Sequence, residues 1–320
     1  MFRIYSFFLG LIISILFLLN FAAAQNLNNE NKCIEKGWQK ISVNINSLER
    51  NILWKGPEGY WKNGAIIALH GGGGTYSNYC SARLLAKPMV EFSELAIKEG
   101  FAIFSLDSGN DLMLDENENP CGKKWDCLAQ KGRDNLDLDF IEKVITDIIP
   151  DLRPLNSVEN IFMTGISNGG FMTILAATHF NHAITAFAII SAGDPYGTHM
   201  DCSVEPLLRP NTPGVFIDNE TGEIIFKDDA CWAITYLYEE KWPEITATEP
   251  PSFKQFHNEG DIGVNISCMK KAQALLSQHG YKDDGPYIIN NSGPKKVWKH
   301  FWLRRYNRPL IDFFAKFIEK

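Results

Sequence analysis

The sequence has no surplus of positive charge, no low-complexity segment and no internal repeat. Its 31 lysine and arginine residues are outnumbered by 38 aspartate and glutamate residues, and the formal net charge is −7. The basic residues are scattered along the chain, and therefore we expect neither nucleic acid nor an acidic surface as a partner. No linker rich in proline, glycine or serine divides the 320 residues, which indicates a single folded domain.

Long apolar runs are also missing, except at the N-terminus. No later segment approaches the ~20 apolar residues that span a bilayer. Arg3 precedes an apolar run from Ile4 to Phe21, which is followed by three alanines. This pattern predicts a secretory signal at residues 1–24, cut after Ala24, and an exported domain at residues 25–320. An uncleaved membrane anchor is the alternative. We expect a secreted or periplasmic protein that has no contact with a membrane after cleavage.

The Cys-x-x-Cys spacing of zinc sites is absent, and we expect neither a metal nor a cofactor. All seven cysteines follow the signal segment, and an oxidising compartment favours their pairing. The short spacing of Cys121 and Cys127 predicts one disulfide, and Cys202 and Cys231, which share one long insertion, form a second candidate pair. An odd number of cysteines leaves at least one thiol free or bonded to another molecule.

What the sequence does contain is an alternation of strand-like and helix-like segments. Continuous apolar runs stopped by glycine or aspartate predict strands that are buried on both faces. Two β-prone runs within 41–53 predict an antiparallel entry to the sheet. Further strands are expected at 64–74, 101–107, 185–193, 252–261 and 293–302, a strand, sharp turn and helix at 159–180, and helices at 88–98, 134–149, 265–279 and 308–320. This order predicts an α/β fold with a mostly parallel sheet and helices on both faces.

The segment Glu159–Phe180 passes from an apolar strand through Gly-Ile-Ser-Asn-Gly-Gly into an apolar helix. Ser167 stands between Gly165 and Gly169 at this joint. A nucleophilic serine on a sharp strand-to-helix turn needs small flanking residues, because bulky side chains would collide with the strand and the helix. The pattern therefore predicts Ser167 as a nucleophile, and a simple glycine-rich turn is the alternative.

A serine hydroxyl needs a base, and in this architecture an acid and then a histidine follow the serine along the chain. His300 meets this order, because it follows the last predicted strand and precedes the terminal helix. The alternative for His300 is packing beside Trp298 and Trp302. The other histidines precede the serine or lie beside its helix, in the insertion, in a strand or at a helix end: His70, His179, His182, His199, His257 and His279.

The acid that orients the histidine is expected on the loop after the strand at 252–261. Asp261 lies there beside Gly260, where a carboxylate can meet the far nitrogen of His300. Asp194 is the main rival and Glu259 a lesser one. A turn-forming role for Asp261 is the other interpretation.

The oxyanion that forms in acyl transfer needs preorganised N–H donors. The backbone N–H of Asn168, directly after the predicted nucleophile, is the first expected donor. The second is expected from the glycine run that follows His70, where no side chain blocks the backbone. Gly72 is the preferred donor and Gly73 the next, and a flexible loop is the alternative for this run.

Together the motifs LHGGGG, GISNGGFMTILAA, AIISAGDPYG and FHNEGD and the ending KHFW…LIDFFAKF resemble those of secreted α/β-hydrolase esterases. The resemblance is densest at 65–192 and is greatest to polyhydroxybutyrate-depolymerase-like and feruloyl-esterase-like enzymes. It implies the α/β-hydrolase fold, with Ser167 as nucleophile, Asp261 as acid and His300 as base. The acid loop reads HNEGD where relatives tend toward HGTAD, and the His300 loop lacks the usual glycine before the histidine.

These features predict an exported serine esterase that cleaves a small or oligomeric ester through an acyl-enzyme. Polyhydroxyalkanoate oligomers and feruloyl or acetyl esters are the candidate substrates. An acyl peptidase or thioesterase with the same triad is one alternative, and a non-catalytic binding protein of the same fold is another. A lid-like insertion is expected at 194–251, and four of its aromatic residues either contact substrate or form a core of their own: Trp232, Tyr236, Tyr238 and Trp242.

Overall fold

A computed structural model describes residues 29–81, 86–108, 123–127, 134–196, 242–261, 263–290 and 297–318, and the backbone of 215–217 and 224–226. The predicted signal segment, the Cys202–Cys231 pair and most of the insertion, including Trp232, Tyr236 and Tyr238, lie outside these residues. Within the described ranges, no helix combines the length and the apolarity that crossing a bilayer requires.

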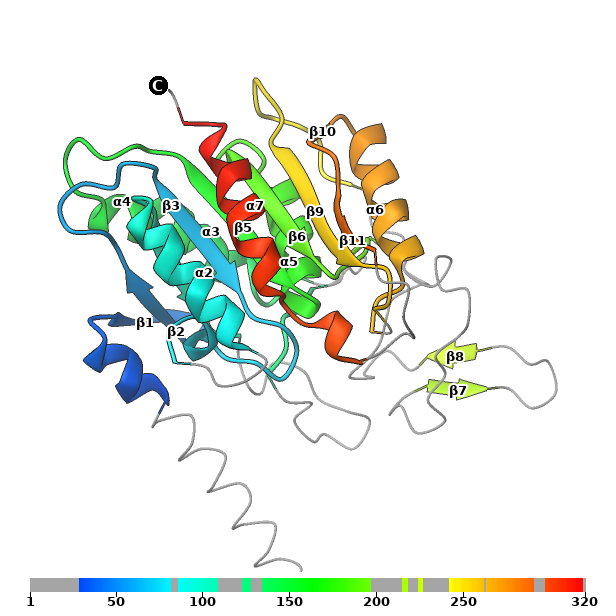
Figure 1. The fold of residues 1–320 in the computed structure, drawn as a ribbon, viewed down its shortest axis with the longest axis horizontal. Coiled ribbons are helices and arrows are strands. Elements are labelled where there is room, and N and C mark those ends of the chain that lie inside the picture. Colours follow the sequence, from blue (N-terminus) through cyan, green and yellow to red (C-terminus); the bar gives the residue numbers. More distant parts are fainter. Residues whose placement is uncertain are drawn as a thin grey trace, which may run out of the picture.

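A nine-stranded sheet forms the centre of the described structure (Figure 1). Its strand order is β1-β2-β4-β3-β5-β6-β9-β10, and β11 also pairs with β9. The pairs β1–β2 and β2–β4 are antiparallel, and the remaining pairs are parallel. This confirms the predicted α/β architecture and its antiparallel entry. The strands are β1 (Gln39–Ile45), β2 (Leu48–Lys55), β3 (Ala65–Leu69), β4 (Ala102–Leu106), β5 (Ile161–Ile166), β6 (Ala186–Ile190), β9 (Ser252–Asn258), β10 (Lys282–Asp283) and β11 (Tyr287–Ile289).

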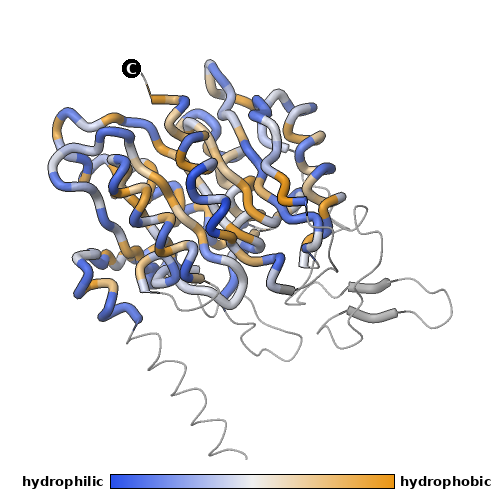
Figure 2. Tube along the Cα trace, in the orientation of Figure 1, coloured by the Kyte–Doolittle hydropathy of each residue, from blue (hydrophilic) through white to orange (hydrophobic). Residues whose placement is uncertain are grey.

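The inner strands are apolar along their whole length because helices cover both faces of the sheet. Every residue of β3, β4 and β6 is buried. Successive residues of β3 enter different cores, with Ile67 and Leu69 on one side of the sheet and Ile66 and Ala68 on the other. Figure 2 shows hydrophobic residues along the central strands and a mixture of hydrophilic and hydrophobic residues along the helices in front of them.

The helices form two layers. On one face α2 (Lys87–Lys98) packs beside α7 (Arg304–Ala315), and Phe314 of α7 stacks on Phe162 of β5 with ring centroids 4.7 Å apart (Figure 1). The other face carries α5 (Asn168–His179), which is buried on nearly all sides. The same layer contains α3 (Leu138–Lys143), a π-helical turn (Val144–Ile148), α4 (Ile149–Leu152) and α6 (Ile266–Gln278). A separate two-stranded ribbon joins β7 (Val215–Ile217) to β8 (Ile224–Phe226).

The strand predicted at 293–302 is wrong for the part that the structure describes, 297–302. Val297–His300 forms a short 3-10 helix, and the last strands among the described residues are β10 and β11. The two tryptophans of this segment have different environments: Trp298 is 47% exposed, whereas Trp302 is 1% exposed and packs on Tyr79 and Phe92. Tertiary packing of Trp302 therefore outweighs the local β preference of this segment.

The helix predicted at 134–149 begins at Leu138 and continues to Leu152, beyond the expected end at Pro150. Proline lacks an N–H and its ring clashes with the carbonyl four residues earlier in a regular α-helix. The π-helical turn Val144–Ile148 ends two residues before the proline, and such a turn changes the hydrogen-bond register. The helix therefore passes the proline with a local change of geometry.

The predicted Cys121–Cys127 disulfide is also wrong. Cys127 is a buried free thiol, whereas Cys33 is bonded to Cys80 across 47 positions of the sequence. Cys268 is disulfide-bonded too. The Sγ atom of Cys127 lies 2.8 Å from the side-chain amide nitrogen of Asn168 and has an environment of core residues. Short sequence spacing thus does not decide the pairing, because the fold directs this side chain inward.

Candidate active site

Ser167 occupies a strained turn between β5 and α5. Its φ of 53° and ψ of −123° lie outside the regions that ordinary residues prefer. The flanking glycines make this turn possible, because a Cβ on Gly165 would lie 2.2 Å from the carbonyl oxygen of Gly169. A Cβ on Gly169 would lie 2.3 Å from the carbonyl oxygen of His70. Both distances are too short for a side chain, so the glycines are needed for close packing as well as for turning.

The sequence-predicted nucleophile, base and acid come together at this turn. The hydroxyl oxygen of Ser167 lies 2.8 Å from Nε2 of His300, and Nδ1 of His300 lies 2.9 Å from both carboxylate oxygens of Asp261. Because a carboxylate only accepts hydrogen bonds, these contacts assign the proton to Nδ1 and leave Nε2 as the acceptor facing Ser167. Ser167 follows β5, Asp261 follows β9, and His300 ends the short helix before α7.

Burial differs among the three groups. The Asp261 side chain is fully buried, and its Oδ1 accepts hydrogen bonds from the backbone N–H groups of Gly263 (2.7 Å) and Val264 (3.1 Å). The His300 side chain is 18% exposed, so its ring remains open to solvent and to a substrate. The acid is therefore held rigidly, whereas the base faces the outside.

Gly263 is a contributor that the sequence analysis missed. A Cβ at this position would lie 2.7 Å from Cγ and Nδ1 of His300, so the backbone of the acid loop packs directly on the imidazole. The signal in the sequence is a glycine two residues after a candidate acid. That spacing gains meaning only once the fold places His300 against the loop.

The rival residues have other contacts. Asp194 is buried, and its Oδ1 accepts the backbone N–H of Tyr196 at 2.9 Å. Glu259 is exposed. Nε2 of His257 contacts the Val264 carbonyl oxygen at 3.1 Å, and His279 stacks on Trp242 with ring centroids 4.5 Å apart.

The glycine run approaches the elbow from β3. A Cβ on Gly71 would lie 3.6 Å from Cβ of Ser167, and one on Gly72 would lie 3.7 Å from Cβ of Asn168. The N–H of Gly73 donates to the Lys123 carbonyl at 2.9 Å, so it is engaged elsewhere. Within the described ranges, the backbone N–H groups of Gly72 and Asn168 have no acceptor, which leaves both able to donate to a ligand.

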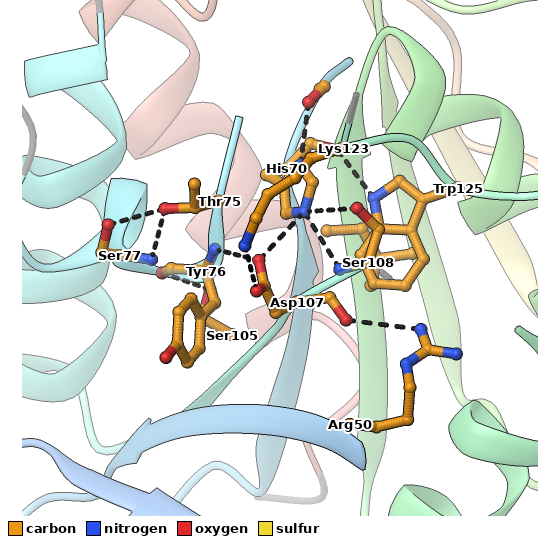
Figure 3. A network of polar contacts seen from close by, with 12 residues as sticks. Arg50, His70, Thr75, Tyr76, Ser77, Ser105, Asp107, Ser108, Lys123 and Trp125 are labelled. Carbon is orange, nitrogen blue, oxygen red and sulfur yellow. Dashed lines mark hydrogen bonds and ion pairs between the residues drawn. The ribbon is translucent and has the colours of Figure 1, made fainter. Parts of the chain in front are cut away.

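His70 holds the glycine run in place (Figure 3). Its Nδ1 lies 2.8 Å from the Gly71 carbonyl oxygen, and its Nε2 lies 3.2 Å from the backbone nitrogen of Ser108. A backbone carbonyl can only accept, so Nδ1 of His70 carries a proton and donates it to Gly71. The Gly74 N–H also donates to the Gly71 carbonyl at 2.9 Å. In a planar trans peptide the carbonyl and the next N–H point in opposite directions, so these bonds also orient the N–H of Gly72.

A buried ion pair supports the same loop. Asp107 is 8% exposed, accepts the Tyr76 backbone N–H at 3.2 Å and forms an ion pair with Lys123 (Figure 3). Burial by itself raises the pKa of the Asp107 carboxyl, but the contact with His70 and the charge of Lys123 outweigh burial and lower it. Asp107 therefore stays charged and fixes Lys123 beside the glycine run.

The side chain of Asn168 holds the neighbouring segment 123–127. Its Oδ1 accepts the Trp125 backbone N–H at 2.6 Å, and its Nδ2 donates to the Trp125 carbonyl at 3.2 Å. The indole N–H of Trp125 in turn donates to the His70 carbonyl at 2.9 Å. The residue after Ser167 thus links the elbow, the glycine run and segment 123–127, an arrangement that the sequence alone did not indicate.

Comparison with known proteins bears on the fold. No protein-family model and no curated protein matches the sequence. Among solved structures, Est1E from Butyrivibrio proteoclasticus is similar over 88% of this chain and 99% of its own, with a TM-score of 0.54 and 17% identity. An acylaminoacyl peptidase is similar over 88% of this chain but 42% of its own (TM-score 0.55, 16% identity).

A thermostable esterase is similar over 87% of this chain and 62% of its own, with a TM-score of 0.52 and 14% identity. This chain thus spans less than two thirds of the esterase and less than half of the peptidase. At these low identities the likeness concerns the path of the backbone. With its strand order, its two helical layers and the turn at Ser167, the chain has the α/β-hydrolase fold.

Proposed function

We propose that the protein is a serine hydrolase of carboxylic esters. The observation that carries the proposal is the continuous line of hydrogen bonds from Ser167 through His300 to Asp261, with contacts of 2.8 Å and 2.9 Å. A serine at a strained elbow, a base whose acceptor nitrogen faces it and a buried acid behind that base are the three parts that acyl transfer requires.

The reaction then proceeds in two halves. Ser167 attacks the ester carbonyl while Nε2 of His300 removes its proton, and Asp261 stabilises the imidazolium that forms. The N–H groups of Gly72 and Asn168 donate to the oxyanion, the contribution that most strongly lowers the barrier in such enzymes. His300 then protonates the departing alcohol. Water, activated by the same histidine, attacks the acyl-enzyme and releases the acid.

Gly72 is preferred over Gly73 as the oxyanion donor. The Gly73 N–H is bonded to the Lys123 carbonyl, and using it for an oxyanion would break that bond. The Gly72 N–H has no such competitor within the described ranges, and the His70 contact to Gly71 orients its peptide. These contacts support a preorganised site, which costs no reorganisation during the reaction.

Two observations favour esters among the possible acyl substrates. Est1E matches this chain over nearly its full length, and another of its structures contains ferulic acid. The acylaminoacyl peptidase, by contrast, corresponds to this chain over less than half of its own length. We infer a small or oligomeric ester as substrate, with feruloyl, acetyl and polyhydroxyalkanoate esters as the groups to test first.

We also infer that the protein acts outside the cytoplasm. The N-terminal sequence has the three parts of a secretory signal. The Cys33–Cys80 disulfide supports this inference, because such bonds persist mainly in oxidising compartments. The test is whether the protein recovered from the periplasm or the medium begins at Gln25.

The enzymatic proposal is tested with the exported protein, a fluorophosphonate probe and p-nitrophenyl acetate and butyrate. We expect covalent labelling of Ser167 and ester hydrolysis, both abolished in Ser167→Ala. The control is Ser277→Ala, because Ser277 lies exposed on α6 and its hydroxyl donates to the Gln273 carbonyl of the same helix. Hydrolysis that persists in Ser167→Ala would overturn the assignment. Labelling without ester turnover, together with cleavage of amides or thioesters, would favour the alternative substrates.

A further inference from the structure

The acid loop, which carries Asp261 and joins β9 to α6, is built around the Asp261 carboxylate. The backbone N–H groups of Gly263 and Val264 donate to Oδ1 of Asp261 at 2.7 and 3.1 Å. The N–H of Asp261 itself donates to the Asn258 carbonyl at 2.9 Å. These bonds fix the carboxylate within the loop, and a further contact is needed to fix the loop relative to the rest of the site.

His257, the residue before Asn258 on β9, supplies that contact. Its side chain is fully buried, and its Nε2 lies 3.1 Å from the Val264 carbonyl oxygen, seven positions further along the sequence. A carbonyl only accepts, so Nε2 carries the proton and donates it. Nδ1 has no hydrogen-bond partner among the described residues. The bond to Val264 therefore orients the imidazole and ties the far end of the acid loop to the sheet.

The distances separate His257 from the triad itself. Its Nε2 lies 3.8 Å from Oδ2 of Asp261, which is beyond hydrogen-bond range, whereas Nδ1 of His300 lies 2.9 Å from both carboxylate oxygens. Burial lowers the pKa of His257 despite the nearby carboxylate, so the ring is uncharged near neutral pH. His257 thus neither competes with His300 for the acid nor adds a charge beside it.

The other side of the acid loop touches the base. A Cβ on Gly263 would lie 2.7 Å from Cγ and Nδ1 of His300, so the Gly263 backbone packs on the imidazole. Val264 follows Gly263 directly, and both donate to Asp261. A shift of the Val264 carbonyl would therefore displace the acid and the surface on which the base rests. The bond from His257 restrains both of them.

We propose that His257 is a positioning residue, which holds the acid loop through the Val264 carbonyl and keeps Asp261 in register with His300. The inference rests on the proposed hydrolase function and deepens it. Asp261 contacts the Nδ1 side of His300, whereas Ser167 faces Nε2, so the loop lies behind the base. The effect of His257 should therefore fall on the chemical step and not on substrate binding.

The test replaces His257 by methionine and by glutamine in the exported protein. Methionine fills a similar space but has no proton to donate to the Val264 carbonyl, whereas the glutamine amide donates from nearly the position of Nε2. Misplacement of a catalytic group by about 1 Å can lower the rate by about a hundredfold. With p-nitrophenyl butyrate we expect kcat to fall by about ten- to a hundredfold in His257→Met, with KM within about twofold. His257→Gln should keep kcat within about threefold of the wild-type value.

The matched control is Ser93→Ala. Ser93 is buried, and its hydroxyl donates to the Met89 carbonyl within α2, on the other face of the sheet. This change removes a buried donor far from the acid loop and should leave kcat unaltered. All assays are run below the lowest unfolding midpoint, so that loss of folded protein does not lower kcat. A wild-type kcat in His257→Met, equal losses in both His257 variants, or a loss carried by KM would overturn the inference while the esterase function stands.

A second measurement does not depend on ester turnover. The proton between Nδ1 of His300 and Asp261 gives a low-field proton resonance, which is assigned by its disappearance in His300→Gln. We expect this resonance in the wild type and in His257→Gln, and a shifted or broadened one in folded His257→Met. An unchanged resonance in His257→Met would overturn the inference. If the wild-type protein is neither labelled by the fluorophosphonate nor active on any ester, the proposed function fails, and the role of His257 in catalysis fails with it.

Discussion

Replacement of Asp261 by asparagine tests the candidate acid and separates it from its rival Asp194. In the structure Oδ1 of Asp261 accepts two backbone N–H groups, from Gly263 and Val264, and both carboxylate oxygens lie 2.9 Å from Nδ1 of His300. An asparagine keeps its oxygen toward the two backbone donors, because an amide nitrogen there would face N–H groups. Its NH₂ group then takes the other position and points at His300.

This exchange reverses the hydrogen bond to the imidazole. An NH₂ group donates, so Nδ1 must accept and the proton moves to Nε2, where it faces the hydroxyl of Ser167. A protonated Nε2 cannot take the serine proton. In serine proteases the corresponding change lowers kcat by about 10⁴-fold. At 1.36 kcal/mol for each factor of ten, that loss equals about 5.4 kcal/mol in the activation free energy.

The assay is hydrolysis of p-nitrophenyl butyrate by wild type, Asp261→Asn and Asp194→Asn, with urea unfolding measured in parallel. We expect a loss of kcat by about 10⁴-fold in Asp261→Asn with the fold retained, because both backbone donors keep their acceptor. Asp194→Asn also keeps an oxygen for the Tyr196 N–H and should retain most of the activity. The reverse order of the two losses would refute the reasoning and make Asp194 the acid.

Two further predictions concern backbone packing and pH. Gly169→Ala places a Cβ 2.3 Å from the His70 carbonyl oxygen, and therefore we expect a loss of about 1–3 kcal/mol in unfolding free energy together with reduced kcat, checked by urea titration and ester assay. Burial lowers the pKa of His257 below the value near 6.5 that it has in the unfolded chain. The unfolded state then takes up the proton first, so stability should fall as pH drops below about 6.5, and more steeply in wild type than in His257→Gln. Unaltered stability of Gly169→Ala, or equal pH profiles for the two proteins, would contradict these predictions.

Local constraints made the elbow readable from the sequence. Only small residues fit beside a strained serine between a buried strand and a helix, so Gly165 and Gly169 mark Ser167 without knowledge of the rest of the fold. Continuous apolar runs identified the inner strands because burial on both faces leaves no room for polar residues. The chain order of acid and histidine then left His300 as the base and Asp261 as the preferred acid, with Asp194 as its rival. The structure brings His300 within hydrogen-bond distance of both Asp261 and Ser167.

Other features depended on contacts between distant segments, which local patterns do not encode. A last strand was expected at 293–302, but Val297–His300 forms a short helix next to the buried Trp302. Cys127 is close to Cys121 in the sequence, yet its thiol faces Asn168 in the core. His70 was excluded as the base because it precedes Ser167 in the chain. Only its contact with Gly71 in the structure revealed that it positions the glycine run.

The sequence by itself determined the order of strands and helices, the strained serine and a short list of partners, because these follow from periodicity, sterics and chain order. The tertiary structure decided which N–H groups are free to bind an oxyanion and which cysteines pair. Each of those depends on which atoms from remote segments meet, and the packing of the whole domain sets that.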